Sequence, residues 1–167
     1  MDQPELSPVV VPDEASCAQV AARLLPALLG HLPDDRAFVV HLSGALGAGK
    51  TTFVRGVLRA AGVMGQIPSP TYTLVETYET PVAFFVHVDF YRLSGASDAE
   101  ALGLREYDRP GAIWLVEWPE RVTERGRNRD IGIVLVHRDT DRLLHVSAAT
   151  AVGASVVAAW APAGEVD

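Results

Sequence analysis

Residues 44–51 read GALGAGKT, and this string constrains the fold more than any other feature of the chain. It is a complete G-x-x-x-x-G-K-[ST] pattern, with an apolar run at 38–42 before it and a helix-compatible stretch from Thr52 after it. Glycines let such a loop curl, so that successive backbone N–H groups converge on phosphate oxygens at the positive end of the following helix. The order strand, loop, helix therefore predicts an α/β fold that binds a nucleoside triphosphate.

Within this loop, each residue type has a chemical task. Lys50 supplies a compact positive charge for the β- and γ-phosphates, and Thr51 offers a hydroxyl to Mg²⁺. The loop residues that we expect to bind the nucleotide are Gly44, Gly47, Ala48, Gly49, Lys50, Thr51 and Thr52.

Two acids follow apolar runs and complete a hydrolytic site. Asp89 ends the run 82–88, and Glu117 ends the run 113–116. A strand that delivers a carboxylate to the edge of the sheet where ligands collect is the arrangement that Mg²⁺ or an attacking water requires. Acids at strand ends also cap turns, and the spacing does not rank Asp89 against Glu117.

The sequence allows two interpretations for each of several other residues near these acids. The turn Ser69-Pro70-Thr71 falls where nucleotide hydrolases place switch loops, although an ordinary loop fits the spacing equally well. Trp118 either covers the nucleotide or packs in the core. His41 and His87 lie inside apolar runs, so we interpret both as core histidines rather than catalytic bases.

The remaining pattern predicts a mixed sheet. A short edge strand is expected at 9–11, a helix capped by Asp13 or Ser16 with Pro26 kinking or ending it, a strand at 37–42, and a helix at 50–61. Two strands at 72–79 and 82–88 enclose a turn, a short helix fits 97–103, and a buried strand fits 112–116. Alternation at 131–137 and 142–147 indicates a hairpin, and 148–161 reads as a terminal helix, with a strand as the alternative. Strands without intervening helices add antiparallel pairs to a parallel core.

Composition narrows the partners. The 167 residues carry a net charge of −7, which argues against unaided binding of DNA or RNA. The arginines at 121, 125, 127 and 129 lie among Glu120, Glu124 and Asp130, so we interpret them as a solvated surface element, with a docking patch as the alternative. A single cysteine, Cys17, reads as buried filler and fits a reducing compartment. No secretory signal or membrane-spanning tract is evident, so we expect one cytoplasmic domain over 1–167, with 1–8 loosely attached.

Four strings, taken together, resemble the TsaE family. They are LGAGKTTFVRG at 46–56, SPTYTLVE at 69–76, HVDFYRL at 87–93 and VEWPE at 116–120. TsaE is the small bacterial ATPase of tRNA threonylcarbamoyladenosine biosynthesis, and the order and spacing of the strings agree over about residues 10–150.

This resemblance implies a P-loop three-layer α/β sandwich with extra antiparallel strands and a Mg²⁺-ATP site. It implies that the chain works with the TsaD and TsaB subunits, which threonylcarbamoylate adenosine 37 of tRNAs that read ANN codons, so that tRNA is met only through the complex. ATP hydrolysis would reset that complex. It implies that Lys50 binds phosphates, that Thr51 and Glu117 hold Mg²⁺, and that Asp89 lies near the γ-phosphate. Further residues that it places at the nucleotide are Thr71, Trp118, Glu14 and Glu120.

One position departs from the family pattern, because Ala45 stands where an acid is usual. Three other functions share the phosphate loop. A small-molecule kinase would need an acceptor pocket and a basic lid, and residues 120–130 make a poor lid. A GTPase would need an Asn-Lys-x-Asp string, which the chain lacks. A nucleotide-sensing module would bind ATP without turnover.

Overall fold

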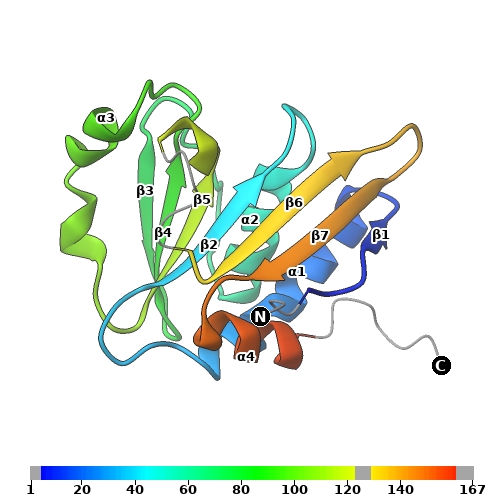
Figure 1. Ribbon diagram of the computed structural model, residues 1–167, viewed down its shortest axis with the longest axis horizontal. Helices are drawn as coiled ribbons and strands as arrows, with labels where there is room; N and C mark the ends of the chain where they lie inside the picture. Colours follow the sequence, from blue (N-terminus) through cyan, green and yellow to red (C-terminus); the bar gives the residue numbers. More distant parts are fainter. Residues whose placement is uncertain (1–4, 123–128, 161–167) are drawn as a thin grey trace.

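The computed structural model describes residues 5–122 and 129–160, and its framework is a single seven-stranded sheet (Figure 1). The strands are β1 (Val9–Val11), β2 (Phe38–Ser43), β3 (Val75–Glu79), β4 (Phe84–Asp89), β5 (Ala112–Glu117), β6 (Ile131–His137) and β7 (Arg142–Ala148). Their order is β1-β7-β6-β2-β5-β4-β3. The four central strands β6, β2, β5 and β4 are parallel, and the pairs at both flanks are antiparallel. The predicted mixed sheet with a parallel core is confirmed.

Helices cover the two faces of the sheet unequally. The helices are α1 (Glu14–Leu29), α2 (Lys50–Ala60), α3 (Ala96–Glu100) and α4 (Ala151–Ala159), with 3₁₀ turns η1 (Leu104–Tyr107) and η2 (Pro119–Arg121). The main core lies between α1, α2, α4 and one face, into which Phe38, Leu115 and Ile133 point. The other face has a smaller core of Val86, Val88, Val116, Phe90 and Leu104. The predicted sandwich is confirmed, with a thin second helical layer.

Helix α1 extends further than its proline suggested. Asp13 caps it by accepting a hydrogen bond of 2.7 Å from the Ser16 N–H. Pro26 does not end the helix, which continues past it to Leu29. A proline removes one backbone donor, and burial of the neighbouring Leu24 and Leu28 offsets that loss.

Close contact between α1 and α2 requires a glycine. A Cβ placed on Gly56 would lie 2.6 Å from the Ala18 carbonyl oxygen and 2.8 Å from the Ala21 Cβ, distances that real side chains do not adopt. Gly56 therefore lets the helix that begins in the phosphate loop lie directly against α1, which fixes the direction from which the loop is presented.

Two local predictions are wrong. The strand predicted from 72 begins only at Val75, because residues 70–73 form turns and Leu74 has a φ of +68°, which an extended strand excludes. Residues 5–8 are not loosely attached throughout: Glu5 forms a bridge with Ser147, and the Leu6 N–H donates to the Val146 carbonyl at 3.2 Å. Residues 1–4 of the segment predicted to be loosely attached, and Arg125 and Arg127 of the arginine group, fall outside the described residues.

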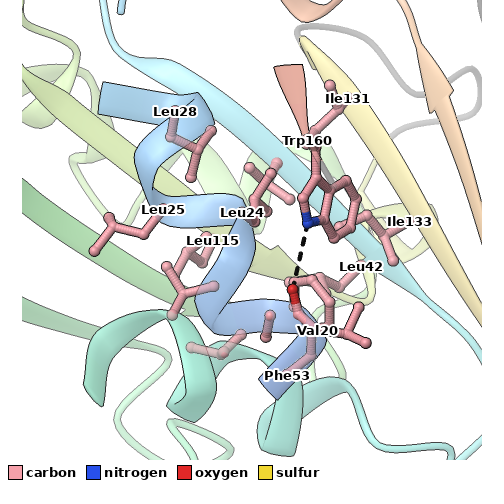
Figure 2. Close-up of a cluster of buried hydrophobic side chains, with 14 of the residues drawn as sticks. Val20, Leu24, Leu25, Leu28, Leu42, Phe53, Leu115, Ile131, Ile133 and Trp160 are labelled. Atoms are coloured by element: carbon pink, nitrogen blue, oxygen red, sulfur yellow. Dashed lines mark hydrogen bonds between the residues drawn. The ribbon is translucent and has the colours of Figure 1, made fainter. Parts of the chain in front are cut away.

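Within the predicted segment 148–161, α4 (Ala151–Ala159) is a helix and not a strand, and it packs against the main core. Thr150 caps α4 by accepting a hydrogen bond from the Gly153 N–H at 3.0 Å. Trp160, 3% exposed, inserts its indole beside Phe53 and donates to the Val20 carbonyl at 3.3 Å (Figure 2). The terminal segment therefore ties α4 to α1 and α2. Within the described part of the chain, no helix is long and apolar enough to cross a membrane.

Candidate nucleotide-binding site

The site lies where the central parallel strands end. β2 leads into the phosphate loop, while β4 and β5 end in Asp89 and Glu117, which are register partners. Glu117 is also the partner of Leu42 at the end of β2. Because carboxyl ends of parallel strands share one edge, the phosphate loop and both acids meet there, as predicted.

Glycines in the phosphate loop adopt conformations that other residues avoid. Gly44 has a φ of +143° and Gly49 a φ of +110°, and a Cβ on Gly44 would lie 2.4 Å from the Leu135 carbonyl oxygen. Gly49 immediately precedes α2, so the positive end of that helix faces the loop. This backbone can present N–H groups to phosphate.

Lys50 folds back over the loop that it follows. Its Nζ donates to the carbonyl oxygens of Gly44 at 2.6 Å and Ala45 at 3.0 Å, and lies 4.0 Å from the centre of the Trp118 ring. Burial lowers the pKa of Lys50 below its ordinary value of 10.5, while the charges of Glu117, Glu120 and Asp89 act in the opposite direction. Phosphate oxygens would replace the two carbonyls as stronger partners for this cation.

Thr51 and Glu117 form the contact that defines the site. The Thr51 Oγ1 donates to both carboxylate oxygens of Glu117, at 2.9 and 3.0 Å. A hydroxyl and a carboxylate held together beside a phosphate loop are the oxygen ligands that a Mg²⁺-nucleotide requires. Glu117 is 2% exposed, so its charge lies in a poorly hydrated position.

Asp89 lies beside Glu117 with few partners. Its carboxylate accepts a hydrogen bond from the Tyr91 N–H at 2.8 Å and a long one of 3.4 Å from the Thr71 hydroxyl, which also lies 2.9 Å from the Ser69 Oγ. Burial raises the pKa of Asp89 above 3.8, the Tyr91 hydrogen bond opposes this, and the charge of Glu117 adds to it. A carboxylate held in this way would gain from a cation or a water that donates to it.

A cavity of about 230 Å³ joins these groups. The residues that line it are Glu14, Leu46, Gly47, Gly49, Lys50, Thr51, Thr52, Ser69, Thr71, Asp89, Tyr91, Glu117 and Trp118. Three predicted contacts do not line it. Gly44 contributes a carbonyl to Lys50, Ala48 is fully buried, and Glu120 is exposed and accepts a 3.3 Å hydrogen bond from Ser43.

A larger hollow, about 920 Å³, lies at the opposite, amino end of the parallel strands. Its buried acid, Asp130, is already paired with Arg36, and the hollow contains no glycine-rich loop. The smaller cavity, and not this hollow, has the phosphate loop and the polar groups suited to phosphate.

A profile of one protein family covers most of the chain. The family is described as "Threonylcarbamoyl adenosine biosynthesis protein TsaE", and the match spans residues 11–149. The chain belongs to the TsaE family. A relative from Haemophilus influenzae, the tRNA threonylcarbamoyladenosine biosynthesis protein TsaE, is 36% identical over 150 residues, which are 90% of this chain and 94% of the relative.

Further relatives agree with this assignment. The TsaE protein of Bacillus subtilis is 36% identical over 103 residues, covering 62% of this chain and 64% of the relative. A crystal structure of Bacillus subtilis YdiB matches with a TM-score of 0.70, covers 95% of each chain and is 24% identical, which supports the fold. The resemblance inferred from the sequence is confirmed, and with it a family assignment to tRNA threonylcarbamoyladenosine biosynthesis.

The TsaE-family site contains features that the sequence reading missed. Leu46, Ser69 and Tyr91 line the cavity, and His87 contacts Glu117. The alternation of β4 places His87 on the same face as Asp89, so counting two residues back from the acid was an available signal. Trp118 has a φ of +56°, lines the cavity and also packs against the smaller core, so both predicted alternatives stay open. Ala45 is exposed and takes part only through its carbonyl.

The residues present fit a magnesium nucleotide better than a metal held by protein alone. Among residues 5–122 and 129–160, no group of three or more His, Cys, Asp or Glu side chains could enclose an ion. Mg²⁺ commonly takes one or two protein oxygens, the rest of its shell being phosphate and water. Thr51 and Glu117 can supply that number.

Proposed function

We propose that this chain is a Mg²⁺-dependent ATPase that supports the TsaD and TsaB subunits when they threonylcarbamoylate adenosine 37 of tRNAs reading ANN codons. The observation that carries the proposal is the contact of Thr51 with Glu117, directly beside Lys50 and the phosphate loop. The family assignment supports the pathway.

Each residue of the cavity has a task in this proposal. The loop amides and Lys50 bind the β- and γ-phosphates, and Thr51 and Glu117 hold the ion. Bound Mg²⁺ supplies charge neutralisation for the phosphates. Asp89 accepts a hydrogen bond from the water that attacks the γ-phosphorus, and cleavage of the bond to the β–γ bridging oxygen yields ADP and phosphate. Thr71 keeps the Asp89 carboxylate aligned, and Trp118 and Glu14 border the nucleotide.

The same proposal places the chain in the cytoplasm and away from direct contact with tRNA. A net charge of −7 gives the protein no general attraction to a nucleic-acid backbone, so the tRNA would be bound by the partner subunits. ATP turnover would then act on the partner subunits and would not itself transfer the threonylcarbamoyl group.

A cellular test separates this function from a structural role. Cells that lack their own copy would carry either the wild type or Lys50→Ala, and mass spectrometry would measure threonylcarbamoyladenosine in their tRNA. We expect the wild type to restore the nucleoside and Lys50→Ala to fail, at equal protein levels. Full modification with Lys50→Ala would overturn the proposal. Thr77→Ala, at an exposed position of β3, serves as the matched control.

A further inference from the structure

His87 lies beneath the proposed metal site. Its side chain is completely buried in β4, and its Nε2 lies 2.8 Å from the Oε1 of Glu117. In the parallel register His87 pairs with Leu115, so Glu117 is the next residue of β5 on the same face. The contact is therefore fixed by the sheet itself and does not depend on a loop.

The Glu117 carboxylate is held from two sides. The His87 contact is made to Oε1 alone, whereas the Thr51 hydroxyl contacts both oxygens. A glutamate has three side-chain torsions, so a carboxylate with only the Thr51 contact would keep several rotamers. The imidazole supports the carboxylate on the side that belongs to the sheet and leaves the other side to the cavity.

The hydrogen of this contact belongs on Nε2 of the imidazole. The His87 Nδ1 is buried and has no hydrogen-bond partner among the described residues. A buried N–H without an acceptor is costly, while Nε2–H has the carboxylate as acceptor. His87 does not line the nucleotide cavity, so its hydrogen bond reaches the site through Glu117.

We propose that His87 is a positioning residue whose Nε2–H fixes the Glu117 carboxylate in the orientation that binds Mg²⁺ with the nucleotide. This inference rests on the proposed function. Groups that orient a metal ligand commonly change metal affinity by about 10- to 100-fold when they are removed. Loss of His87 should therefore weaken metal binding more than it weakens metal-free nucleotide binding.

Three variants test this proposal. His87→Leu removes the donor and keeps an apolar volume, while His87→Gln keeps an N–H at nearly the position of Nε2. His41→Leu is the matched control, because His41 is also a buried strand histidine but lies on the other face of the sheet. Mn²⁺ replaces Mg²⁺, and electron paramagnetic resonance measures its affinity in the presence of a non-hydrolysable ATP analogue. Calorimetry in EDTA measures binding of the analogue without metal.

We expect His87→Leu to bind Mn²⁺ at least about 10-fold more weakly than the wild type, with little change in metal-free binding of the analogue. His87→Gln and His41→Leu should stay close to the wild type. If His87→Leu does not fold, His87→Asn replaces it. The asparagine side chain is too short to reach Glu117, so comparison of His87→Asn with His87→Gln again tests whether an N–H donor to Glu117 is needed for metal binding.

Two results would overturn the proposal. One is wild-type Mn²⁺ affinity in His87→Leu or His87→Asn. The other is an equal loss of Mn²⁺ affinity and of metal-free binding of the analogue in the Leu, Asn and Gln variants. That result would show that His87 acts only through packing in the core. Failure of the wild type to bind Mn²⁺ with the analogue is a separate result, because it would remove the proposed function and this inference with it.

Discussion

Two buried aspartates lie at opposite ends of the same sheet, and they differ in whether a positively charged side chain pairs with them. Asp130, fully buried before β6, accepts two hydrogen bonds from Arg36 at 2.7 and 2.8 Å, and others from the Val39 N–H and the Thr150 hydroxyl. Asp89, 3% exposed at the end of β4, has no cation as a partner among the described residues. Only the second carboxylate faces a cavity beside a phosphate loop.

The pKa values of the two acids move apart for that reason. Burial raises the pKa of both groups, but at Asp130 the hydrogen bonds from Arg36, Thr150 and Val39 outweigh burial and hold the pKa below 3.8. At Asp89 burial prevails and the pKa is raised. A buried acid with its own cation stabilises the fold, whereas one without a cation is suited to a ligand that supplies the positive charge.

The strongest test of this contrast is Asp89→Asn, which removes the charge and keeps the shape. We expect phosphate release from ATP to fall by about 100-fold or more, because an oriented acceptor in the transition state is lost. The free energy of unfolding should not fall, since a buried charge is removed. Phosphate-release kinetics and chemical denaturation measure the two effects. If Asp89→Asn hydrolysed ATP normally but were less stable than the wild type, Asp89 would have the structural role that we give to Asp130.

Asp130→Asn is the matched change at the other end of the sheet. It leaves Arg36 without its counter-charge, and we expect a loss of about 3 kcal/mol in unfolding free energy, the low end for a broken buried pair because Arg36 is 37% exposed. Denaturation measures the loss. Phosphate release per folded molecule should match the wild type, and a selective loss of hydrolysis would contradict the assignment of Asp130 to stability.

Acid titration of stability gives the two acids opposite signs. Because the folded state lowers the pKa of Asp130, its contribution is fully present above pH 3.8 and is lost as the pH falls through the lowered value. Because the folded state raises the pKa of Asp89, its contribution to stability decreases as the pH rises from 3.8 through the raised value. We would measure the free energy of unfolding of the wild type and both asparagine variants over the acid range. As the pH rises, the wild type should gain stability relative to Asp130→Asn and lose stability relative to Asp89→Asn. Parallel curves would refute the opposite shifts.

Two threonines extend the comparison, since each donates to a buried acid at a helix start. Thr150→Ala removes the cap of α4 and a 2.6 Å hydrogen bond to Asp130, so we expect a loss of about 1 to 2 kcal/mol in unfolding free energy and unchanged Mg²⁺ dependence. Thr51→Ala should instead raise the Mg²⁺ concentration required for half-maximal phosphate release. If Thr150→Ala instead changed the Mg²⁺ requirement and Thr51→Ala changed only stability, the functional and structural roles given to the two ends of the sheet would be wrong.

Local sequence patterns predicted most of the architecture because local physics determines it. Alternation along 131–137 and 142–147 predicted the β6–β7 hairpin, and the start of α1 was predicted to within the two caps Asp13 and Ser16, of which the structure has Asp13. The late start of β3 was not predictable, because the positive φ of Leu74 depends on its surroundings and not on its residue type. The same holds for Pro26, which burial of its neighbours keeps inside the helix.

The site was predicted as a set of residue types and not as a set of contacts. The phosphate loop and the acids at strand ends were visible because glycine spacing and strand ends have known consequences. The contact of His87 with Glu117 depends on the parallel register of β4 and β5, which no local pattern specifies. The absence of Glu120 from the cavity follows from η2, which turns it outward after Trp118.

The most direct test of the whole account is phosphate release by the purified chain with TsaD, TsaB and ATP, with and without Mg²⁺. We expect free phosphate that depends on Mg²⁺ and on Lys50. Tight ATP binding without turnover would contradict the account in favour of a nucleotide sensor, and transfer of phosphate to a metabolite would contradict it in favour of a kinase.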